Sequence, residues 1–262
     1  MIDPSGLEKL RIAFIFRTFD FAMEVTLIII PTFNERDNIS PLVESIFLNF
    51  PEGNLLFVDD SSPDGTGLEI KLLQKKHPDK IHLLTRDKKE GLGKAYIDGF
   101  QWGLDRGYTY IFQMDADLSH PASSIPFMLE TLRKDKDVVV GSRYLSGVNV
   151  VNWPLTRIAL SLGASFYVRL ITGLPIKDPT AGFVGYRASV LRKLKLKAIN
   201  FVGYAFQIEM KFKLWKKGCT IAEIPIVFVN RERGISKMNG SIIWEAVVGV
   251  IYLKFTSIFS RL

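Results

Sequence analysis

This sequence of 262 residues contains few cysteines and histidines and lacks a serine nucleophile motif. Cys219 is the single cysteine, so neither an intramolecular disulfide nor a thiolate metal cluster can form. The three histidines, His77, His82 and His120, lack metal-ligand spacing, and no serine nucleophile elbow is present. The cysteine count fits a reducing compartment, and the other absences argue against a zinc centre and a serine hydrolase.

Long uninterrupted hydrophobic runs are also missing. The apolar run at 12–16 is short and is followed by Arg17, so it does not read as a signal peptide. Residues 242–259 approach the length of a membrane span, about 20 apolar residues, but Glu245 and Lys254 interrupt them. We expect residues 241–262 to form an amphipathic helix that lies on a membrane or packs on the protein. Residues 1–22 are an N-terminal extension whose status the sequence leaves open.

The composition that remains is that of a globular protein, with 47% apolar and 23% charged residues and a formal net charge of +7. This length and composition suit one large α/β domain, which we place at residues 23–240. A positive balance fits nucleic acid, phosphate-bearing substrates or an anionic membrane surface. No nucleic-acid recognition motif accompanies it, so we do not expect nucleic acid as a partner.

Short apolar runs alternate with amphipathic segments through the first half of the chain, which predicts strands joined by helical crossovers. The result is a mainly parallel, doubly wound sheet of the Rossmann-like kind, in which ligands bind at the carboxyl ends of the strands. Polar clusters follow the predicted strands at those ends. The predicted strands are 25–30 (ended by Pro31), 55–58, 81–84, 108–114 and 138–140, and the predicted helices are 39–48, 68–77, 93–104, 125–132 and 153–171.

Two acidic turns are the first candidates for chemistry. Asp115 and Asp117 follow a strand and flank Ala116, so both carboxylates can face one divalent cation and the oxygens of a diphosphate. Asp60 lies in the turn 59–66, where a carboxylate can accept from a base edge or a ribose hydroxyl. The alternative for this second turn is an Asx-type turn with Thr66 as a helix N-cap.

Glycine and basic residues supply further candidates. Residues 90–94 lack the full phosphate-loop pattern, so we interpret their glycines as a tight turn into a helix. Arg143 and the basic run 231–237 have no evident acidic partner nearby in the sequence. Such side chains can bind phosphate oxygens, and a basic loop can close over a diphosphate.

Taken together, the ordered motifs resemble the family-2, inverting, A-type glycosyltransferases, and within them the dolichol- or polyprenol-phosphate mannose synthases. The resemblance covers roughly residues 24–255. The motifs are Pro-Thr-Phe-Asn-Glu at 31–35, Asp-Asp-Ser-Ser-Pro-Asp-Gly-Thr at 59–66, Gly-Leu-Gly-Lys-Ala-Tyr at 91–96, Met-Asp-Ala-Asp-Leu-Ser-His at 114–120, Gly-Ser-Arg-Tyr at 141–144, Asn-Trp-Pro-Leu at 152–155, Phe-Gln-Ile-Glu at 206–209 and the basic run 231–237.

The resemblance assigns roles residue by residue. Asp117 and Arg143 are expected to be catalytic, and Mg²⁺ or Mn²⁺ is expected at Asp115, Asp117 and Ser119, where Ser119 replaces a glutamine of some members. Arg143, Arg157 and Ser161 are expected to bind the acceptor phosphate. Phe33 replaces a usual tyrosine and keeps the ring for stacking. The donor, with its guanine nucleoside and diphosphate, is expected at Pro31, Phe33, Glu35, Val58, Asp60, Asp115, Ala116, Asp117, Arg231 and Lys237.

The implied reaction is inverting transfer of mannose from GDP-mannose to dolichyl or polyprenyl phosphate, which gives a β-mannosyl phosphoryl lipid. The resemblance also implies a peripheral enzyme on the cytoplasmic face of a membrane, held by amphipathic surface or by a small membrane-anchoring subunit. The motif residues leave two alternatives open. One is transfer of glucose from UDP-glucose, or of another sugar, to the same lipid; the other is an inactive sugar-nucleotide-binding protein at a membrane.

Overall fold

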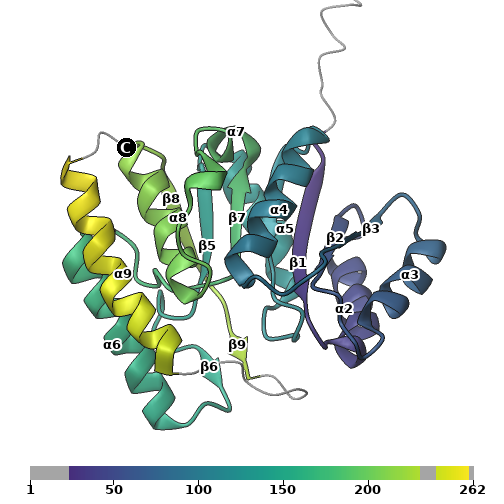
Figure 1. Cartoon of the computed structure of the whole chain (residues 1–262), viewed down its shortest axis with the longest axis horizontal. Coiled ribbons are helices and arrows are strands. Elements are labelled where there is room, and N and C mark those ends of the chain that lie inside the picture. The colour runs from purple at the N-terminus through teal and green to yellow at the C-terminus, as the bar shows by residue number, and fades with distance from the viewer. Residues whose placement is uncertain (1–23, 231–239, 260–262) are drawn as a thin grey trace, which may run out of the picture.

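The computed structural model describes residues 24–230 and 240–259 and shows helices on both faces of one large sheet (Figure 1). The strands of this sheet run in the order β3-β2-β1-β4-β7-β5-β8, and β7 is antiparallel to both of its neighbours. The other neighbouring pairs are parallel, which confirms the predicted mainly parallel α/β sheet. A short parallel pair, β6 and β9, lies beyond its lower edge in Figure 1.

The strands are β1 (Thr26–Thr32), β2 (Asn54–Asp59), β3 (Ile81–Thr85), β4 (Tyr110–Gln113), β5 (Val138–Ser142), β6 (Val150–Val151), β7 (Val184–Arg187), β8 (Ile221–Pro225) and β9 (Phe228–Val229). The α-helices are α2 (Arg36–Asn49), α3 (Thr66–Lys76), α4 (Leu92–Asp105), α5 (Ile125–Arg133), α6 (Leu155–Thr172), α7 (Ala188–Leu191), α8 (Tyr204–Lys216) and α9 (Gly240–Phe259), with 3₁₀ turns at Ala122–Ser124 and Leu196–Ala198.

All five predicted strands and all five predicted helices are present, with ends that differ from the predicted ones by up to three residues. Pro31 was expected to end the first strand, but β1 continues to Thr32, and Pro31 lies opposite Val58 of β2. The neighbour on the other side, β4, already ends opposite Ile29. The missing proline N–H therefore leaves no hydrogen bond unmade within the sheet.

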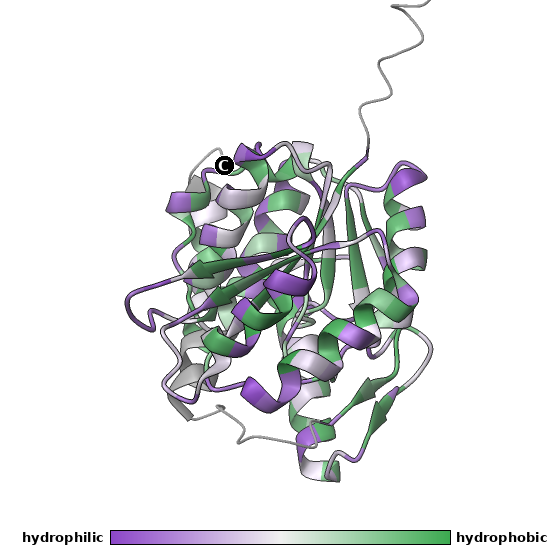
Figure 2. Ribbon diagram, turned by 90° about the vertical axis from the view of Figure 1, so that its right-hand side faces the viewer, coloured by the Kyte–Doolittle hydropathy of each residue, from purple (hydrophilic) through white to green (hydrophobic). Residues whose placement is uncertain are grey.

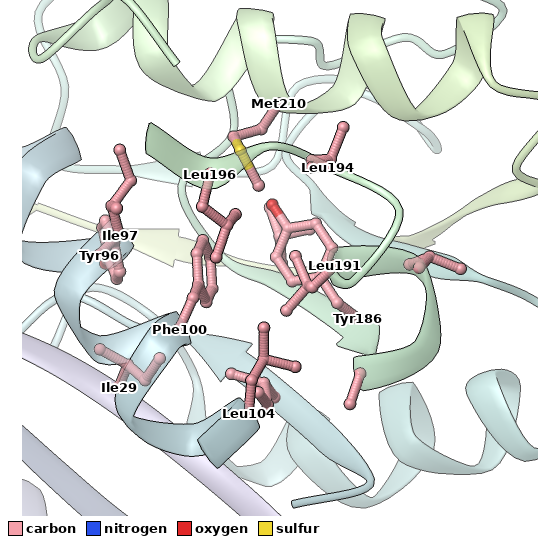
Figure 3. Packing of buried hydrophobic residues seen from close by; sticks show 14 of the residues in the cluster. Ile29, Tyr96, Ile97, Phe100, Leu104, Tyr186, Leu191, Leu194, Leu196 and Met210 are labelled. Atoms are coloured by element: carbon pink, nitrogen blue, oxygen red, sulfur yellow. The ribbon is translucent and has the colours of Figure 1, made fainter. Parts of the chain in front are cut away.

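The sheet separates two hydrophobic cores because side chains along a buried strand alternate between its faces. Leu27 and Ile29 of β1 contribute to the core beneath α4 and α8, and Ile28 and Ile30 contribute to the core beneath α2 and α5. The strands are mostly apolar and the covering helices mix polar with apolar residues (Figure 2). The first core contains Tyr96, Phe100, Tyr186, Leu191 and Met210, which pack closely (Figure 3).

Glycines let α4 approach the sheet directly. A Cβ on Gly99 would come within 2.6 Å of the Ile29 side chain, and one on Gly103 within 2.7 Å of Leu27. At the start of the same helix, Gly91 has φ 102°, a conformation that suits glycine. Gly91 is the N-cap residue of α4, so the predicted tight turn into a helix is confirmed.

A third apolar cluster joins α6, α8 and α9, which lie together at the left of Figure 1. Val168 of α6, Phe212 of α8 and Val250 and Leu253 of α9 are buried in it. The C-terminal helix therefore packs on the protein through one of its faces. Within residues 24–230 and 240–259, no helix combines the length and apolar character that crossing a membrane requires.

Candidate active site at the carboxyl edge of the sheet

The acidic turn that follows β4 is shaped by its own backbone and by Ser119. Leu118 has φ 62°, and the side chain of Asp117 is 8% exposed. The Ser119 N–H donates to Asp117 Oδ1 at 3.2 Å, and the Ser119 hydroxyl makes a very short hydrogen bond to the same oxygen. Ser119 thereby orients Asp117, and its role as a metal ligand stays a prediction.

Asp115 is positioned by two buried aromatic residues that the sequence did not identify as functional. The Tyr96 hydroxyl donates to Asp115 Oδ1 at 3.3 Å, and burial together with the Asp115 charge raises the pKa of Tyr96 well above its ordinary value. The Asp115 N–H donates to His120 Nδ1 at 3.1 Å, which leaves the proton of a neutral ring on Nε2, 3.9 Å from Asp115 Oδ2. His120 stacks on Phe183, which fixes the plane of its ring.

The chemistry of this turn suits a divalent cation of the Mg²⁺ or Mn²⁺ kind, which prefers oxygen ligands. Asp115 and Asp117 supply carboxylate oxygens at adjacent points of one turn. Over the part of the chain that the structure describes, no group of three His, Cys, Asp or Glu side chains gathers to hold a metal. A cation here would therefore complete its coordination with water and with the oxygens of a bound diphosphate.

The predicted nucleoside residues meet between the ends of β1 and β2. Pro31 and Val58 are register partners, and the Asp60 N–H donates to Thr32 O at 3.2 Å. The half-buried Phe33 ring lies beneath Lys89, whose Nζ is 4.2 Å from the ring centroid. Glu35 lies at the N-cap of α2 and accepts from Asn38 at 2.8 Å.

Asp60 has a basic partner that sequence reasoning missed, because Arg86 lies at the end of a different strand. Arg86 Nε is 3.3 Å from Asp60 Oδ1 and 3.4 Å from Asp98 Oδ2, and the Arg86 side chain is 7% exposed. Burial raises the pKa of Asp60, and the Arg86 charge opposes that rise. Among the described residues, Asp60 Oδ1 and the two terminal nitrogens of Arg86 make no hydrogen bond, although Arg86 Nη2 lies 3.5 Å from Glu90 Oε2 as an ion pair.

Arg143 lies just after β5 and is held by an acidic residue 35 positions further along the chain. Arg143 Nε donates to Asp178 Oδ2 at 2.7 Å, and Nη2 donates to Asp178 Oδ1 at 2.6 Å and to Thr180 Oγ1 at 2.8 Å. Asp178 is fully buried, and burial alone would raise its pKa. The charge and hydrogen bonds of Arg143 outweigh that effect and lower the pKa of Asp178.

The loop that carries Asp178 is in turn anchored from α8. Lys211 is fully buried, and its Nζ donates to the main-chain oxygens of Pro179 at 3.1 Å, Ala181 at 2.7 Å and Gln207 at 3.0 Å. Burial lowers the pKa of Lys211 to about 7, although the nearby Asp178 charge opposes this. Arg143 is thus positioned by a layer of buried polar groups.

The three residues predicted to bind the acceptor phosphate converge at the start of α6. The Arg157 guanidinium lies 3.9 Å from the centroid of Trp153, and that of Arg143 lies 5.7 Å from the same ring. The hydroxyl of Tyr144, next to Arg143 in the chain, donates to Ser161 Oγ at 2.7 Å. Two arginines therefore lie near one indole ring, and Ser161 is joined to this group through Tyr144.

Phe228 of β9 connects this basic group with the acidic turn. Its ring is 5.6 Å from His120, 5.4 Å from Trp153 and 5.9 Å from the Arg143 guanidinium, measured between centroids or to the guanidinium carbon. The acidic turn and the two arginines consequently form one continuous site. The predicted diphosphate-binding residues Arg231 and Lys237 lie outside the described residues.

An α/β fold with an acidic turn at the carboxyl edge of the sheet and two arginines joined to that turn through Phe228 is the arrangement of an A-type nucleotide-sugar transferase. The chain belongs to glycosyl transferase family 2, whose family model matches residues 27–195. This confirms the family to which the motifs were assigned.

Proteins with curated names resemble the chain over most of its length. A polyprenol monophosphomannose synthase of Mycolicibacterium smegmatis is 44% identical over 225 residues, which cover 86% of this chain and 85% of that protein. An undecaprenyl-phosphate mannosyltransferase of Micrococcus luteus is 46% identical over 224 residues, covering 86% and 91%.

Solved structures show the same fold at much lower sequence identity. A glucosyl-3-phosphoglycerate synthase of Mycobacterium tuberculosis, solved with Mn²⁺, UDP and glucosyl-3-phosphoglycerate, aligns with a TM-score of 0.64 at 14% identity. The alignment covers 89% of this chain and 81% of that one. This similarity establishes the A-type fold.

Proposed function

We propose that the protein transfers mannose with inversion from GDP-mannose to the phosphate of a dolichyl or polyprenyl lipid. The observation that carries the proposal is the contact of Phe228 with His120 at the end of the acidic turn on one side and with Arg143 on the other, while Trp153 packs against Phe228 and carries Arg157. An acidic turn on one side and two arginines on the other suit a reaction between two phosphate-bearing substrates. The names of the two relatives support mannose as the sugar and a polyprenyl phosphate as the acceptor.

The acceptor supplies its own nucleophile. A phosphate monoester has a second pKa of about 6, so it is largely a dianion at neutral pH and needs no protein base. One of its oxygens attacks the anomeric carbon, the bond from that carbon to the donor diphosphate breaks, and GDP departs. Arg143 and Arg157 would hold the attacking phosphate and offset the repulsion between the two anionic substrates.

Asp115 and Asp117 would hold the divalent cation, with Ser119 and His120 fixing their orientation. When bound, such a cation neutralises charge that develops on a departing diphosphate. The fold neighbour of known structure contains Mn²⁺ with UDP, which supports a metal here and leaves the choice between Mg²⁺ and Mn²⁺ to experiment.

Asp60, Arg86 and Asp98 support a guanine base in the donor. Guanine presents N–H donors on N1 and N2 and acceptors at O6 and N7, so it suits a site that offers carboxylates and a guanidinium together. The buried atoms of Asp60 and Arg86 that make no hydrogen bond within the described residues are the groups that a base could satisfy. Transfer from UDP-glucose is the alternative that a comparison of donors separates from this one.

The helices beside the acceptor residues support a position at a membrane surface. Alpha-helix α6 carries Arg157 and Ser161 and also exposes Leu155, Phe166 and Leu170, with exposed fractions of 83%, 65% and 69%. Helix α9 lies along α6 and exposes further apolar side chains from 248 to 255 (Figure 1). The lipid would then enter from this face, and we place the protein on the cytoplasmic side, held by these helices or by a small anchoring subunit.

Binding of GDP with and without Mn²⁺ tests the donor half of the proposal. Isothermal titration should show tighter GDP binding when Mn²⁺ is present, and Asp117→Asn should abolish the effect of the metal and the transfer reaction. A circular dichroism spectrum that matches the unmodified protein controls for folding. Metal-independent nucleotide binding, or full activity of Asp117→Asn, would contradict the metal assignment.

A further inference from the structure

Gln207 is a buried polar side chain that is not among the residues proposed to bind the donor, the acceptor phosphate or the metal. It lies in the first turn of α8 and is 2% exposed. Neither Nε2 nor Oε1 has a hydrogen-bond partner among the residues that the structure describes. A buried donor or acceptor without a partner costs about 1–3 kcal/mol, so an amide with neither end satisfied is a candidate for binding a polar group of a ligand.

The surroundings of Gly182 show where this amide points. A Cβ placed on Gly182 would lie 3.8 Å from each of three atoms, Asp115 Oδ2, Gln207 Nε2 and His120 Cε1. The Gln207 amide therefore reaches the same small space as the carboxylate of the acidic turn. That space lies at the diphosphate end of the site, away from the nucleoside residues at the ends of β1 and β2.

Packing within the protein does not account for the glycine. Gly182 is not among the residues with a positive φ, and its added Cβ would meet ordinary van der Waals contacts at 3.8 Å. An alanine would thus fit without strain in the structure as described. The absence of a side chain leaves at least the space of a methyl group beside Asp115 and Gln207, and a ligand group could use that space.

The chemistry of a carboxamide identifies the ligand. Its NH₂ donates and its oxygen accepts, so satisfying both ends takes a group that also donates and accepts. Diphosphate oxygens only accept at neutral pH, whereas the hydroxyls of a sugar do both. Building on the proposed function, we propose that Gln207 binds hydroxyl groups of the donor's hexosyl unit in the space left by Gly182, and that it contributes to the choice of sugar.

The test compares a sugar nucleotide with the same nucleoside diphosphate. In the presence of Mn²⁺, Gln207→Leu should weaken GDP-mannose binding by about 10- to 100-fold, the loss of one or two hydrogen bonds to the ligand, and leave GDP binding within about 2-fold. Gly182→Ala should act in the same direction, because its methyl group occupies the proposed sugar space. Both variants should also lower kcat/KM for GDP-mannose more than they change the KM for the lipid phosphate.

Thermal unfolding separates a binding role from a structural one. Gln207→Leu removes two unsatisfied polar atoms, so the unliganded variant should unfold at the same temperature as the unmodified protein or above it. Gln113→Leu is the matched control: Gln113 is equally buried and its Nε2 also lacks a partner among the described residues, but its Oε1 accepts from the Tyr186 hydroxyl at 2.9 Å in the core. That change should lower the unfolding temperature and leave the ratio of GDP-mannose to GDP affinity unaltered.

An unchanged affinity ratio in both Gln207→Leu and Gly182→Ala would overturn the assignment of the sugar-binding residue. The unmodified protein tests the proposed function separately, through its preference between donors. Preference for UDP-glucose over GDP-mannose would overturn the proposed donor, and the same ratio measured with UDP-glucose and UDP would then decide the role of Gln207.

Discussion

Breaking the buried ion pair of Arg143 and Asp178 should have the largest effect on the free energy of unfolding among the changes proposed. Asp178→Asn keeps the shape of the side chain but removes its negative charge. The carboxylate accepts hydrogen bonds from Arg143 N at 3.0 Å, Nε at 2.7 Å and Nη2 at 2.6 Å. Removing one partner of a buried ion pair costs about 3–5 kcal/mol. Arg143 retains 12% exposure, so we expect the lower end, a loss of about 3 kcal/mol in the free energy of unfolding.

Equilibrium unfolding in urea measures this loss, and a double-mutant cycle shows whether it belongs to the pair. Arg143→Met together with Asp178→Asn should cost less than the sum of the single changes, with a coupling of about 1–3 kcal/mol. Arg133→Gln is the control for an exposed ion pair. Arg133 Nε lies 2.8 Å from Glu24 Oε2, and the two side chains are 48% and 43% exposed. Its cost should stay below about 1 kcal/mol.

The same substitution should reach the reaction, because Asp178 fixes the guanidinium that is proposed to hold the acceptor. We expect the KM for the lipid phosphate to rise in Asp178→Asn, with GDP affinity unchanged. A cost no greater than that of Arg133→Gln, together with an unaltered KM, would refute the view that this pair positions the acceptor site.

Three further outcomes are expected. Burial lowers the pKa of Lys211 from 10.5 to about 7, so between these pH values the unfolded chain binds a proton that the folded protein does not. Stability measured in urea should therefore rise from pH 7 towards pH 10, and Lys211→Met should flatten that rise; a parallel pH profile would contradict this. Arg157→Gln should raise the KM for the lipid phosphate about 10-fold or more at unchanged GDP affinity, and an unchanged KM would move the acceptor site elsewhere. The double variant Phe166→Ser, Leu170→Ser should reduce sedimentation with anionic vesicles about 10-fold or more. The control Leu48→Ser changes an 85% exposed side chain on α2 and should leave sedimentation unaltered. Equal losses in the double variant and the control would argue against a membrane face on α6.

Local sequence patterns predicted the first half of the fold well, because each strand there is a short apolar run followed by a polar turn. Strand β7 escaped prediction, since the residues Val184–Arg187 are few and gain their place only by antiparallel pairing with β4 and β5. Pairing of that kind is a long-range property that no local periodicity reports. The acidic turn was identifiable because Asp115 and Asp117 lie only two positions apart in the sequence.

The supporting residues of the site were not visible in the same way. Asp178, Arg86 and Lys211 act through partners that are distant in sequence, so their roles emerge only when the fold brings those partners together. Gln207 was noted as part of a motif without a role, and its meaning depends on burial and on the empty space beside Gly182. The individual roles of Pro31, Glu35, Ser119 and the other residues assigned by resemblance remain predictions.

Transfer of labelled mannose from GDP-mannose to a polyprenyl phosphate in detergent tests the central claim most directly. The reaction is run with Mg²⁺ or Mn²⁺ and, as a control, with EDTA. The account predicts a metal-dependent lipid product that releases its label in mild acid, as a glycosyl phosphate does. Failure to form that product with either metal would contradict the claim, whether UDP-glucose supports transfer instead or neither donor does.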